Sequence, residues 1–241
     1  MKKKVFKILF VIFIIICSGI FLLFNTTSLK EVRDQEAKEQ ITKEYHEIVS
    51  SVAKEEKTDN IIQQYQQAFH NSDIIGRLSI ENTNLDVPVA QSGDNDYYLN
   101  HLLDKSVNSL GSVYLDYRNK TTDRKIIIYG HNSENVYTEF NMLENYTHSS
   151  YYHTHSIINF QTENNFYQYK IFSIYIATDD FQHVNLNYNS YDYAKHLAWL
   201  KTQSLYDTGV EVNGYDHIII LQTCYFSPDD SFLIIAAKKI G

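Results

Sequence analysis

Two short apolar runs near the C-terminus constrain the fold more than any other part of the sequence. They are His217–Leu221 and Phe232–Ala237, and the polar, turn-forming stretch Ser227–Asp230 lies between them. Both runs are rich in β-branched residues and are five or six residues long, which is typical of strands buried on both faces. The sequence therefore predicts two central strands joined by a polar turn.

Cys224 lies where the first of these strands is expected to end, and it is the only cysteine outside the N-terminal apolar segment. A side chain at the end of a strand, beside a loop, is well placed to act on a ligand. The alternative interpretation is a packed core residue, because unpaired cysteine is among the most buried residue types.

Residues 1–27 are predicted to form a cytoplasmic tip and a membrane anchor. The apolar run Val5–Phe24 has 20 residues, enough to cross about 30 Å of hydrocarbon as a helix, and the lysines at its start mark the cytoplasmic side. A cleaved signal peptide would have a shorter apolar region, and a lipoprotein signal would have a small residue where Ile16 precedes Cys17. We therefore expect a single-pass protein of the cell membrane whose remaining residues lie outside the cell.

The exported part of the chain is acidic. Residues 1–27 hold four lysines and no acidic residue, so the remainder carries a formal charge of −12 against −8 for the whole chain. This disfavours nucleic-acid binding, which needs clustered Lys and Arg. With one cysteine the exported part forms no internal disulfide, so its stability comes from a hydrophobic core. A lone thiol is easily oxidised outside the cell, which favours a chemical role for Cys224.

Residues 28–71 and residues 72–241 differ in pattern. In the first range, apolar residues recur at helical spacing, which predicts two amphipathic helices that form a stalk or dock on the domain. In the second, short β-like runs alternate with polar turns, which predicts one mainly β domain: an antiparallel or mixed eight-stranded barrel. An inserted helix is expected at Tyr191–Leu205 and a shorter one at Thr138–Tyr146. The predicted strands are Ile74–Ile80, Leu85–Ala90, Ser112–Tyr117, Lys125–Tyr129, Ile157–Gln161, Phe166–Ala177, His217–Thr223 and Phe232–Lys238.

A second candidate catalytic residue follows another buried strand. The apolar run Lys125–Tyr129 is followed by Gly130, His131 and Asn132. An imidazole beside Cys224 would raise the thiolate fraction of the sulfur and would then protonate a leaving amine. The alternative for His131 is a polar residue that ends a strand without a chemical role.

Metal sites are not expected. The histidines at 148, 153 and 155 lack the cysteine or carboxylate spacing of a closed zinc site. The acidic stretches Asp94–Asp96 and Asp229–Asp230 are typical of solvated loops rather than of calcium sites. We therefore predict no metal and no cofactor.

The motifs around the two candidate residues resemble those of one enzyme family. The stretch Leu221–Cys224, with sequence LQTC, resembles the L-x-T-C signature of sortases, and Tyr129–Asn132, YGHN, resembles their histidine motif. Histidine precedes cysteine, unlike in papain-like peptidases, and the caspase Gln-Ala-Cys-x-Gly motif is absent. Other segments resemble class B sortases in the same order: Glu81–Asn84 with Pro88-Val89, Asp94–Leu99 and Asp116–Asn119.

The resemblance implies a sortase-type barrel on the outer face of a Gram-positive membrane. It implies a cysteine transpeptidase that cleaves a C-terminal sorting motif of surface proteins, often Asn-Pro-x-Thr-Asn in class B. The acyl group is held as a thioester and passes to a peptidoglycan-precursor or pilin amine. The catalytic residues would be Cys224 and His131. Residues near the substrate would be Asn95, Leu99, Thr223, Tyr225 and His183.

Phe232 departs from the family pattern. Sortases carry an arginine on the last strand about eight residues after the cysteine, and no arginine follows Arg124 in this chain. A phenylalanine supplies none of the fixed N–H donors of a guanidinium. Two alternatives therefore stay open. One is a catalytically impaired sortase-like domain that binds sorting peptides or pilins, and the other is a hydrolytic cysteine peptidase that needs no acceptor amine.

Overall fold

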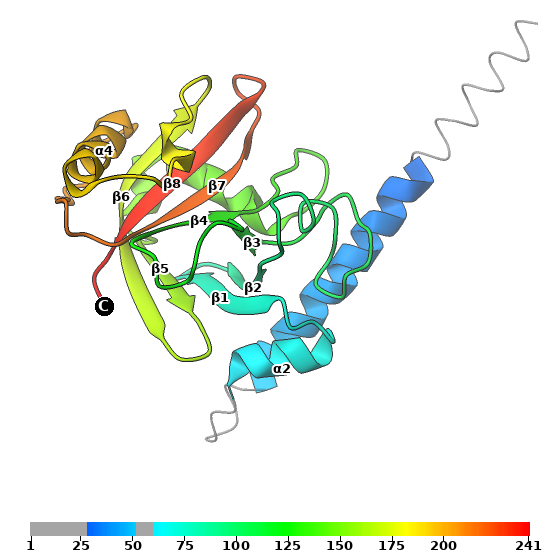
Figure 1. Cartoon of the computed structure of the whole chain (residues 1–241). Helices are drawn as coiled ribbons and strands as arrows, with labels where there is room; N and C mark the ends of the chain where they lie inside the picture. The colour runs from blue at the N-terminus through cyan, green and yellow to red at the C-terminus, as the bar shows by residue number, and fades with distance from the viewer. Residues whose placement is uncertain (1–27, 52–59) are drawn as a thin grey trace, which may run out of the picture.

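A computed structural model describes residues 28–51 and 60–241. Eight strands close into a barrel in the order β1-β2-β3-β4-β7-β8-β6-β5 (Figure 1), which confirms the predicted architecture. The strands are β1 (Ile74–Ile80), β2 (Asp86–Ala90), β3 (Tyr114–Leu115), β4 (Lys125–Tyr129), β5 (Ile157–Gln161), β6 (Phe166–Ala177), β7 (Ile218–Tyr225) and β8 (Ser231–Lys239). The predicted anchor in residues 1–27 lies outside the described residues. Among those that are described, no helix has the length and apolar character needed to span a bilayer.

Three neighbouring strands of the barrel, β4, β7 and β8, consist mostly of buried residues. β4 runs parallel to β7, and β7 runs antiparallel to β8. Residues Ile218–Leu221 are all buried because alternate side chains enter two different apolar clusters. Ile219 and Leu221 belong to the cluster inside the barrel, whereas Ile218 and Ile220 pack outward beneath α4 (Ser190–Gln203). The prediction that these runs are buried on both faces is therefore confirmed.

Four of the predicted strands have other bounds than expected: β2 differs by one residue at one end, β8 differs by one residue at each end, and β3 and β7 differ by more. The strand expected at Ser112–Tyr117 is reduced to Tyr114–Leu115. It ends there because the Asp116 carboxylate accepts the backbone N–H of Arg118 at 2.9 Å, which turns the chain away from the sheet. β7 extends to Tyr225, so Cys224 lies within the strand rather than after its end. The extension is held by pairing with β8, in which Cys224 lies opposite Phe232.

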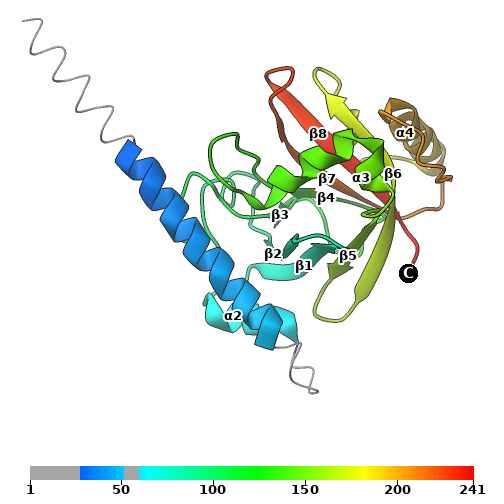
Figure 2. The same ribbon diagram turned by 180° about the vertical axis from the view of Figure 1, so that it is seen from behind.

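Helices lie on opposite sides of the barrel (Figures 1 and 2). Residues 28–51 form one long helix, and together with α2 (Ile61–Ala68) it lies on one side, while α4 lies on the other. The long helix docks on the barrel through Lys38, whose Nζ lies 2.8 Å from Glu139 and donates to the Gly111 carbonyl at 2.7 Å. The short helix expected at Thr138–Tyr146 is instead the 3₁₀ helix η1 (Glu139–Thr147), which α3 (Ser149–Tyr152) follows.

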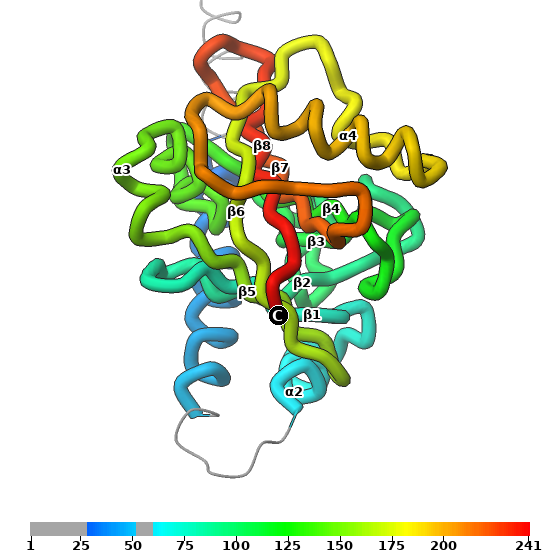
Figure 3. The backbone as a smooth tube through the Cα atoms, turned by 90° about the vertical axis from the view of Figure 1, so that its left-hand side faces the viewer, coloured from blue at the N-terminus to red at the C-terminus, as the bar shows by residue number. Residues whose placement is uncertain are grey.

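One end of the barrel gathers the segments that surround the candidate residues. The turn between β7 and β8 and the segment that follows β6 extend from the same end (Figure 3). That segment contains the short 3₁₀ helix η2 (Gln182–Val184). The Phe181 ring beside it lies 5.8 Å from the Phe232 ring, centroid to centroid, so the two segments are in contact.

Candidate active site

Cys224 and His131 line the same small cleft, at the ends of the parallel strands β7 and β4. The cleft has a volume of about 90 Å³. Its walls are Leu99, Tyr114, Tyr129, Gly130, His131, Gln222, Thr223, Cys224 and Phe232. Because β4 and β7 are paired in parallel register up to Tyr129 and Gln222, the residues that follow in both strands emerge side by side.

The position of His131 depends on close packing at Gly130. A Cβ atom on Gly130 would lie 2.7 Å from Cδ2 of Phe140, closer than side-chain packing allows. The glycine is therefore required for a close approach, and not for an unusual backbone angle as its motif suggests. The Gly130 carbonyl also accepts a hydrogen bond from the Thr223 hydroxyl at 2.8 Å, which joins β4 to β7 directly beside the cysteine.

The imidazole of His131 is held by the backbone of the loop that carries Leu99. Its Nε2 lies 2.8 Å from the Leu99 carbonyl oxygen, and a carbonyl only accepts, so Nε2 carries the proton. The lone pair is then on Nδ1. Burial lowers the pKa of His131, and the hydrogen bond to Leu99 raises it by a smaller amount. The ring is therefore neutral at pH 7 and can accept a proton.

The thiol of Cys224 is half-buried and unpaired. Burial raises its pKa above the ordinary value, so the resting sulfur is protonated at neutral pH. The backbone carbonyl of Cys224 accepts a hydrogen bond from Asn132 Nδ2 at 3.0 Å, which ties the end of β7 to the residue after His131. Within the described residues no hydrogen bond joins Sγ to the imidazole. The cleft therefore holds a neutral thiol and a neutral base.

A buried carboxylate, that of Asp116, holds Tyr129, one of the residues that line the cleft. Asp116 is fully buried and accepts the Tyr129 hydroxyl at 2.9 Å and the Arg118 guanidinium at 2.7 Å and 2.9 Å. Burial raises the pKa of this carboxyl, but the hydrogen bonds from Arg118, Tyr129 and Asn95 outweigh it and lower the pKa overall. Arg118 also donates to the Val184 carbonyl at 3.0 Å, so the same network fixes η2.

The five residues expected near the substrate fall into different places. Leu99 and Thr223 line the cleft, although the Thr223 hydroxyl is engaged by Gly130. Asn95 lies outside the cleft wall and donates to Asp116 at 3.2 Å. Tyr225 lines a neighbouring hollow of about 290 Å³ rather than the cleft. His183 is fully buried, and its Nε2 lies 2.9 Å from Oε1 of Gln222.

The cleft residues contribute no cationic side chain. Phe232 lines the cleft beside Cys224, its cross-strand partner in β8, and is half-buried and packed on Phe181. The two arginines that precede His131 most closely in the chain have other partners. Arg118 is paired with Asp116, and Arg124 lies over the Tyr193 ring at 4.0 Å. Within the residues that the structure covers, no group of three His, Cys, Asp or Glu side chains forms a potential metal site.

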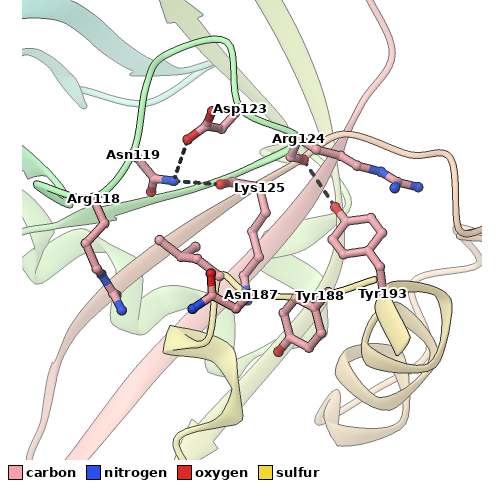
Figure 4. A pocket seen from close by; sticks show the side chains of 9 residues that line it. Arg118, Asn119, Asp123, Arg124, Lys125, Asn187, Tyr188 and Tyr193 are labelled. Atoms are coloured by element: carbon pink, nitrogen blue, oxygen red, sulfur yellow. Dashed lines mark hydrogen bonds between the residues drawn. The ribbon is translucent and has the colours of Figure 1, made fainter. Parts of the chain in front are cut away.

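A larger hollow of about 500 Å³ lies between β4 and the segment before α4 (Figure 4). Several of its polar groups are bonded to one another. The Asn119 amide donates to Asp123 at 3.2 Å and to the Lys125 carbonyl at 2.9 Å, and the Tyr193 hydroxyl donates to the Arg124 carbonyl at 3.2 Å. No cysteine or histidine lines this hollow. The chemistry therefore belongs to the smaller cleft.

Several side chains of the site were not identified from the sequence. Gln222 lies inside the LQTC motif, but the motif gives it no role of its own. Asp116 belongs to the stretch Asp116–Asn119, which resembles class B sortases without indicating what its side chains do. The parts played by Tyr114 and Tyr129 follow from strand register, because both sit on one face of neighbouring strands. No local signal in the sequence marks such side chains, since their partners are distant in the chain.

Comparisons with known proteins agree on one family. The Sortase domain profile matches residues 78–240. Sortase B of Listeria monocytogenes is 47% identical over 64 residues, which is 26% of each chain. Sortase B of Staphylococcus aureus is 37% identical over 90 residues, 36% of each chain, so the aligned segments span only about a quarter and about a third of these relatives.

The solved structures extend the likeness over most of the chain. A Staphylococcus aureus sortase B–substrate complex superposes with a TM-score of 0.74 at 27% identity, covering 88% of this chain and 98% of the solved one. The chain therefore belongs to the sortase family of cysteine transpeptidases, and the relatives that it matches are class B members.

Proposed function

We propose that this protein cleaves a C-terminal sorting motif of surface proteins and transfers the acyl group to an amine of a cell-wall precursor or a pilin. The observation that carries the proposal is the shared cleft of Cys224 and His131. The solved Staphylococcus aureus relative was obtained as a substrate complex, which supports the same class of substrate. An Asn-Pro-x-Thr-Asn-like motif is the expected target.

The first half of the reaction forms a thioester. His131 takes the thiol proton on its free nitrogen as Cys224 Sγ attacks the threonine carbonyl carbon, and the carbonyl π electrons move to oxygen. When this oxyanion collapses, the C–N bond breaks and the imidazolium gives its proton to the leaving amine. A neutral thiol and a neutral imidazole suit these steps. One proton passes from the Cys224 sulfur to His131 and then to the leaving amine.

The second half consumes the thioester. An acceptor amine attacks the carbonyl carbon and loses a proton to His131, and the sulfur leaves as the thiolate, which His131 then reprotonates. Asn95, Leu99, Thr223 and Tyr225 are the proposed substrate neighbours. His183 acts through Gln222 in this proposal, since it is fully buried.

The proposed location is the outer face of the cell membrane. Residues 1–27 would anchor the chain, residues 28–71 would form the N-terminal helices, and residues 72–241 would form the catalytic barrel. The packing of Lys38 against Glu139 supports helices that dock on the barrel rather than a detached stalk. A domain that binds sorting peptides without turnover is not favoured, because the family matches are transpeptidases.

The test uses fluorogenic Asn-Pro-x-Thr-Asn peptides, with x varied, and the full-length protein. Wild type should cleave at least one peptide and show an acyl adduct on Cys224 by intact mass. Cys224→Ala should abolish cleavage, and His131→Ala should lose on the order of 10³-fold, because nucleophile and base act as a unit. His148→Ala, at an exposed histidine, is the matched control.

Three outcomes would contradict the proposal. Turnover by wild type with no acyl adduct under any trapping condition would exclude the thioester route. A His131→Ala protein with most of the wild-type rate would move proton transfer to another group. Added hydroxylamine should divert the product from the acid to the hydroxamic acid, and oligoglycine should divert it to the amide. A rate and product independent of the added nucleophile would identify a hydrolase.

A further inference from the structure

Acyl transfer at Cys224 develops an oxyanion, and hydrogen-bond donors aimed at that oxygen lower the barrier. Most side-chain donors of the cleft are already engaged. The Thr223 hydroxyl donates to the Gly130 carbonyl and the Tyr129 hydroxyl to Asp116, while His131 Nε2 donates to the Leu99 carbonyl. With no cation in the cleft wall, the reaction needs another donor.

Two side chains of the cleft retain an available donor. Within the described residues, neither the Tyr114 hydroxyl nor the Gln222 amide Nε2 donates a hydrogen bond. Gln222 is two residues before Cys224 in β7, so both side chains lie on the same face of one strand. Tyr114 is in β3, and β4 separates it from β7. Gln222 is therefore the donor that shares a strand and a face with the reacting sulfur.

The Gln222 carboxamide is held in one orientation by His183. The His183 ring is fully buried, and burial lowers its pKa to about 4, so the ring is neutral at pH 7. Its Nε2–H donates to Oε1 of Gln222 at 2.9 Å. His183 Nδ1 is buried without a partner, which is consistent with this tautomer because Nδ1 then carries only a lone pair. Gln222 lines the cleft, and with Oε1 bound to His183 its amide nitrogen remains available as a donor.

The segment that carries His183 also covers Phe232. The Phe181 ring lies 6.1 Å from the His183 ring and 5.8 Å from the Phe232 ring, centroid to centroid. Phe232 lies directly opposite Cys224 in the β7–β8 pair. The partner of the Gln222 carboxamide and the ring beside Cys224 are therefore held by the same segment.

We propose that Gln222 Nε2 donates a hydrogen bond to the oxyanion formed at Cys224, and that His183 is the positioning residue that aims it. The proposal rests on the proposed function in one respect only, the acylation of Cys224. The bond strengthens as the carbonyl π electrons move to oxygen and relaxes when the thioester forms. His183 touches no reacting atom.

The test compares two reagents that act on the same sulfur. Acylation by p-nitrophenyl acetate passes through a tetrahedral oxyanion, whereas alkylation by iodoacetamide displaces iodide and forms none. Gln222→Met should slow single-turnover acylation about 10²- to 10³-fold, the usual loss for one oxyanion donor. Its alkylation rate should stay within about threefold of wild type. Gln203→Met, at the exposed end of α4, is the matched control.

The role of His183 is tested in the same assay. His183→Phe keeps an aromatic ring in the buried site and removes the Nε2–H donor. It should slow acylation about tenfold while leaving alkylation unchanged, because Gln222 remains but is no longer oriented. In the Gln222→Met background, His183→Phe should slow acylation no further, because both substitutions remove the same interaction.

Three results would overturn the inference. Acylation by the Gln222→Met protein at the wild-type rate would show that Gln222 donates nothing, and a loss in Tyr114→Phe alone would assign the role to Tyr114. Equal losses in acylation and alkylation would mean that the variant disturbs the thiol itself. Additive losses in the double variant would separate His183 from Gln222. Because the ester carries no sorting motif, these outcomes are independent of whether wild type cleaves any sorting peptide.

Discussion

At the scale of single residues, Phe232 is the position where the chain departs from its family. Its ring is half-buried, lies opposite Cys224 and packs on Phe181. A guanidinium at this position could extend its charged end to water, as long basic side chains do. Phe232→Arg therefore introduces a donor beside the oxyanion without forcing a charge into the core.

We expect Phe232→Arg to change the kcat of wild type by less than about threefold, because Gln222 already supplies a donor. In a Gln222→Met background the same substitution should recover at least about tenfold of the lost rate. Steady-state kinetics and melting curves on the same preparations provide the measurement. Phe166→Arg, at a phenylalanine that is 56% exposed, is the control for added charge.

A large gain in the wild-type background would contradict this expectation. It would mean that the cleft lacks an effective donor and would count against the role given to Gln222. No recovery in the Gln222→Met background, with both proteins folded, would mean that position 232 does not reach the oxyanion.

The sequence singles out Cys224 and His131 because both sit in short motifs beside apolar runs, and the structure brings the two side chains to one cleft. The sequence does not allow their supporting residues to be predicted. The contact between His183 and Gln222 joins positions 39 apart in the chain, and the fit of Gly130 against Phe140 depends on a distance between two elements. Such contacts exist only after the barrel has closed.

At the scale of elements, hydrophobic patterning predicted the place of every strand in the chain. The strands β1, β4, β5 and β6 have the predicted bounds. Errors fell where side chains compete with the sheet for backbone groups, as Asp116 does at the end of β3. The helical spacing at 138–146 was real, but the chain there forms a 3₁₀ helix, η1, whose first residue is paired with Lys38.

The buried ion pair between Lys38 and Glu139 fastens the helix over residues 28–51 to the barrel. Their side chains are 5% and 6% exposed. Lys38→Met would leave the Glu139 carboxylate buried without its cation, which typically costs about 3–5 kcal/mol. We expect a loss of that size in the free energy of unfolding, measured by urea titration of a protein that contains this helix.

Lys43→Met on the same helix is the control. Lys43 and Glu47 are 77% and 70% exposed and lie 3.9 Å apart, and such surface pairs contribute about 0–1 kcal/mol. If Lys38→Met and Lys43→Met were equally stable, the ion pair would not hold the helix. Adding Glu139→Gln to Lys38→Met should restore part of the loss, because the unpaired charge is removed.

At the scale of the whole molecule, the barrel separates two apolar clusters, and the cleft opens where the outer cluster meets solvent. The outer cluster is covered by α4 and by the segment that carries η2, and Phe232 packs at its edge. Phe232 and Tyr129 therefore line the cleft and also pack against the outer cluster. This region also contains two buried histidines, His183 and His196, whose titration is tied to the stability of the entire fold.

This arrangement predicts that the protein loses stability in mild acid. Burial lowers the pKa of His183 to about 4 and that of His196 to about 3, whereas both are near 6.5 in the unfolded chain. Below pH 6.5 the unfolded state therefore binds protons that the folded state does not, and stability falls as the pH falls toward the folded pKa values. From pH 7 to pH 5 each group should cost about 2 kcal/mol.

Urea unfolding of wild type at pH 7, 6 and 5 measures the total loss, and His183→Phe should remove about half of its pH dependence. His148→Ala, at an exposed histidine, should keep the wild-type slope. Burial also lowers the pKa of Lys125, to about 7, but its effect on stability develops between its ordinary value of 10.5 and pH 7, mostly above this window. A wild-type stability that stays level from pH 7 to pH 5 would show that the buried histidines accept protons in the folded state, and the neutral tautomer assigned to His183 would then be wrong.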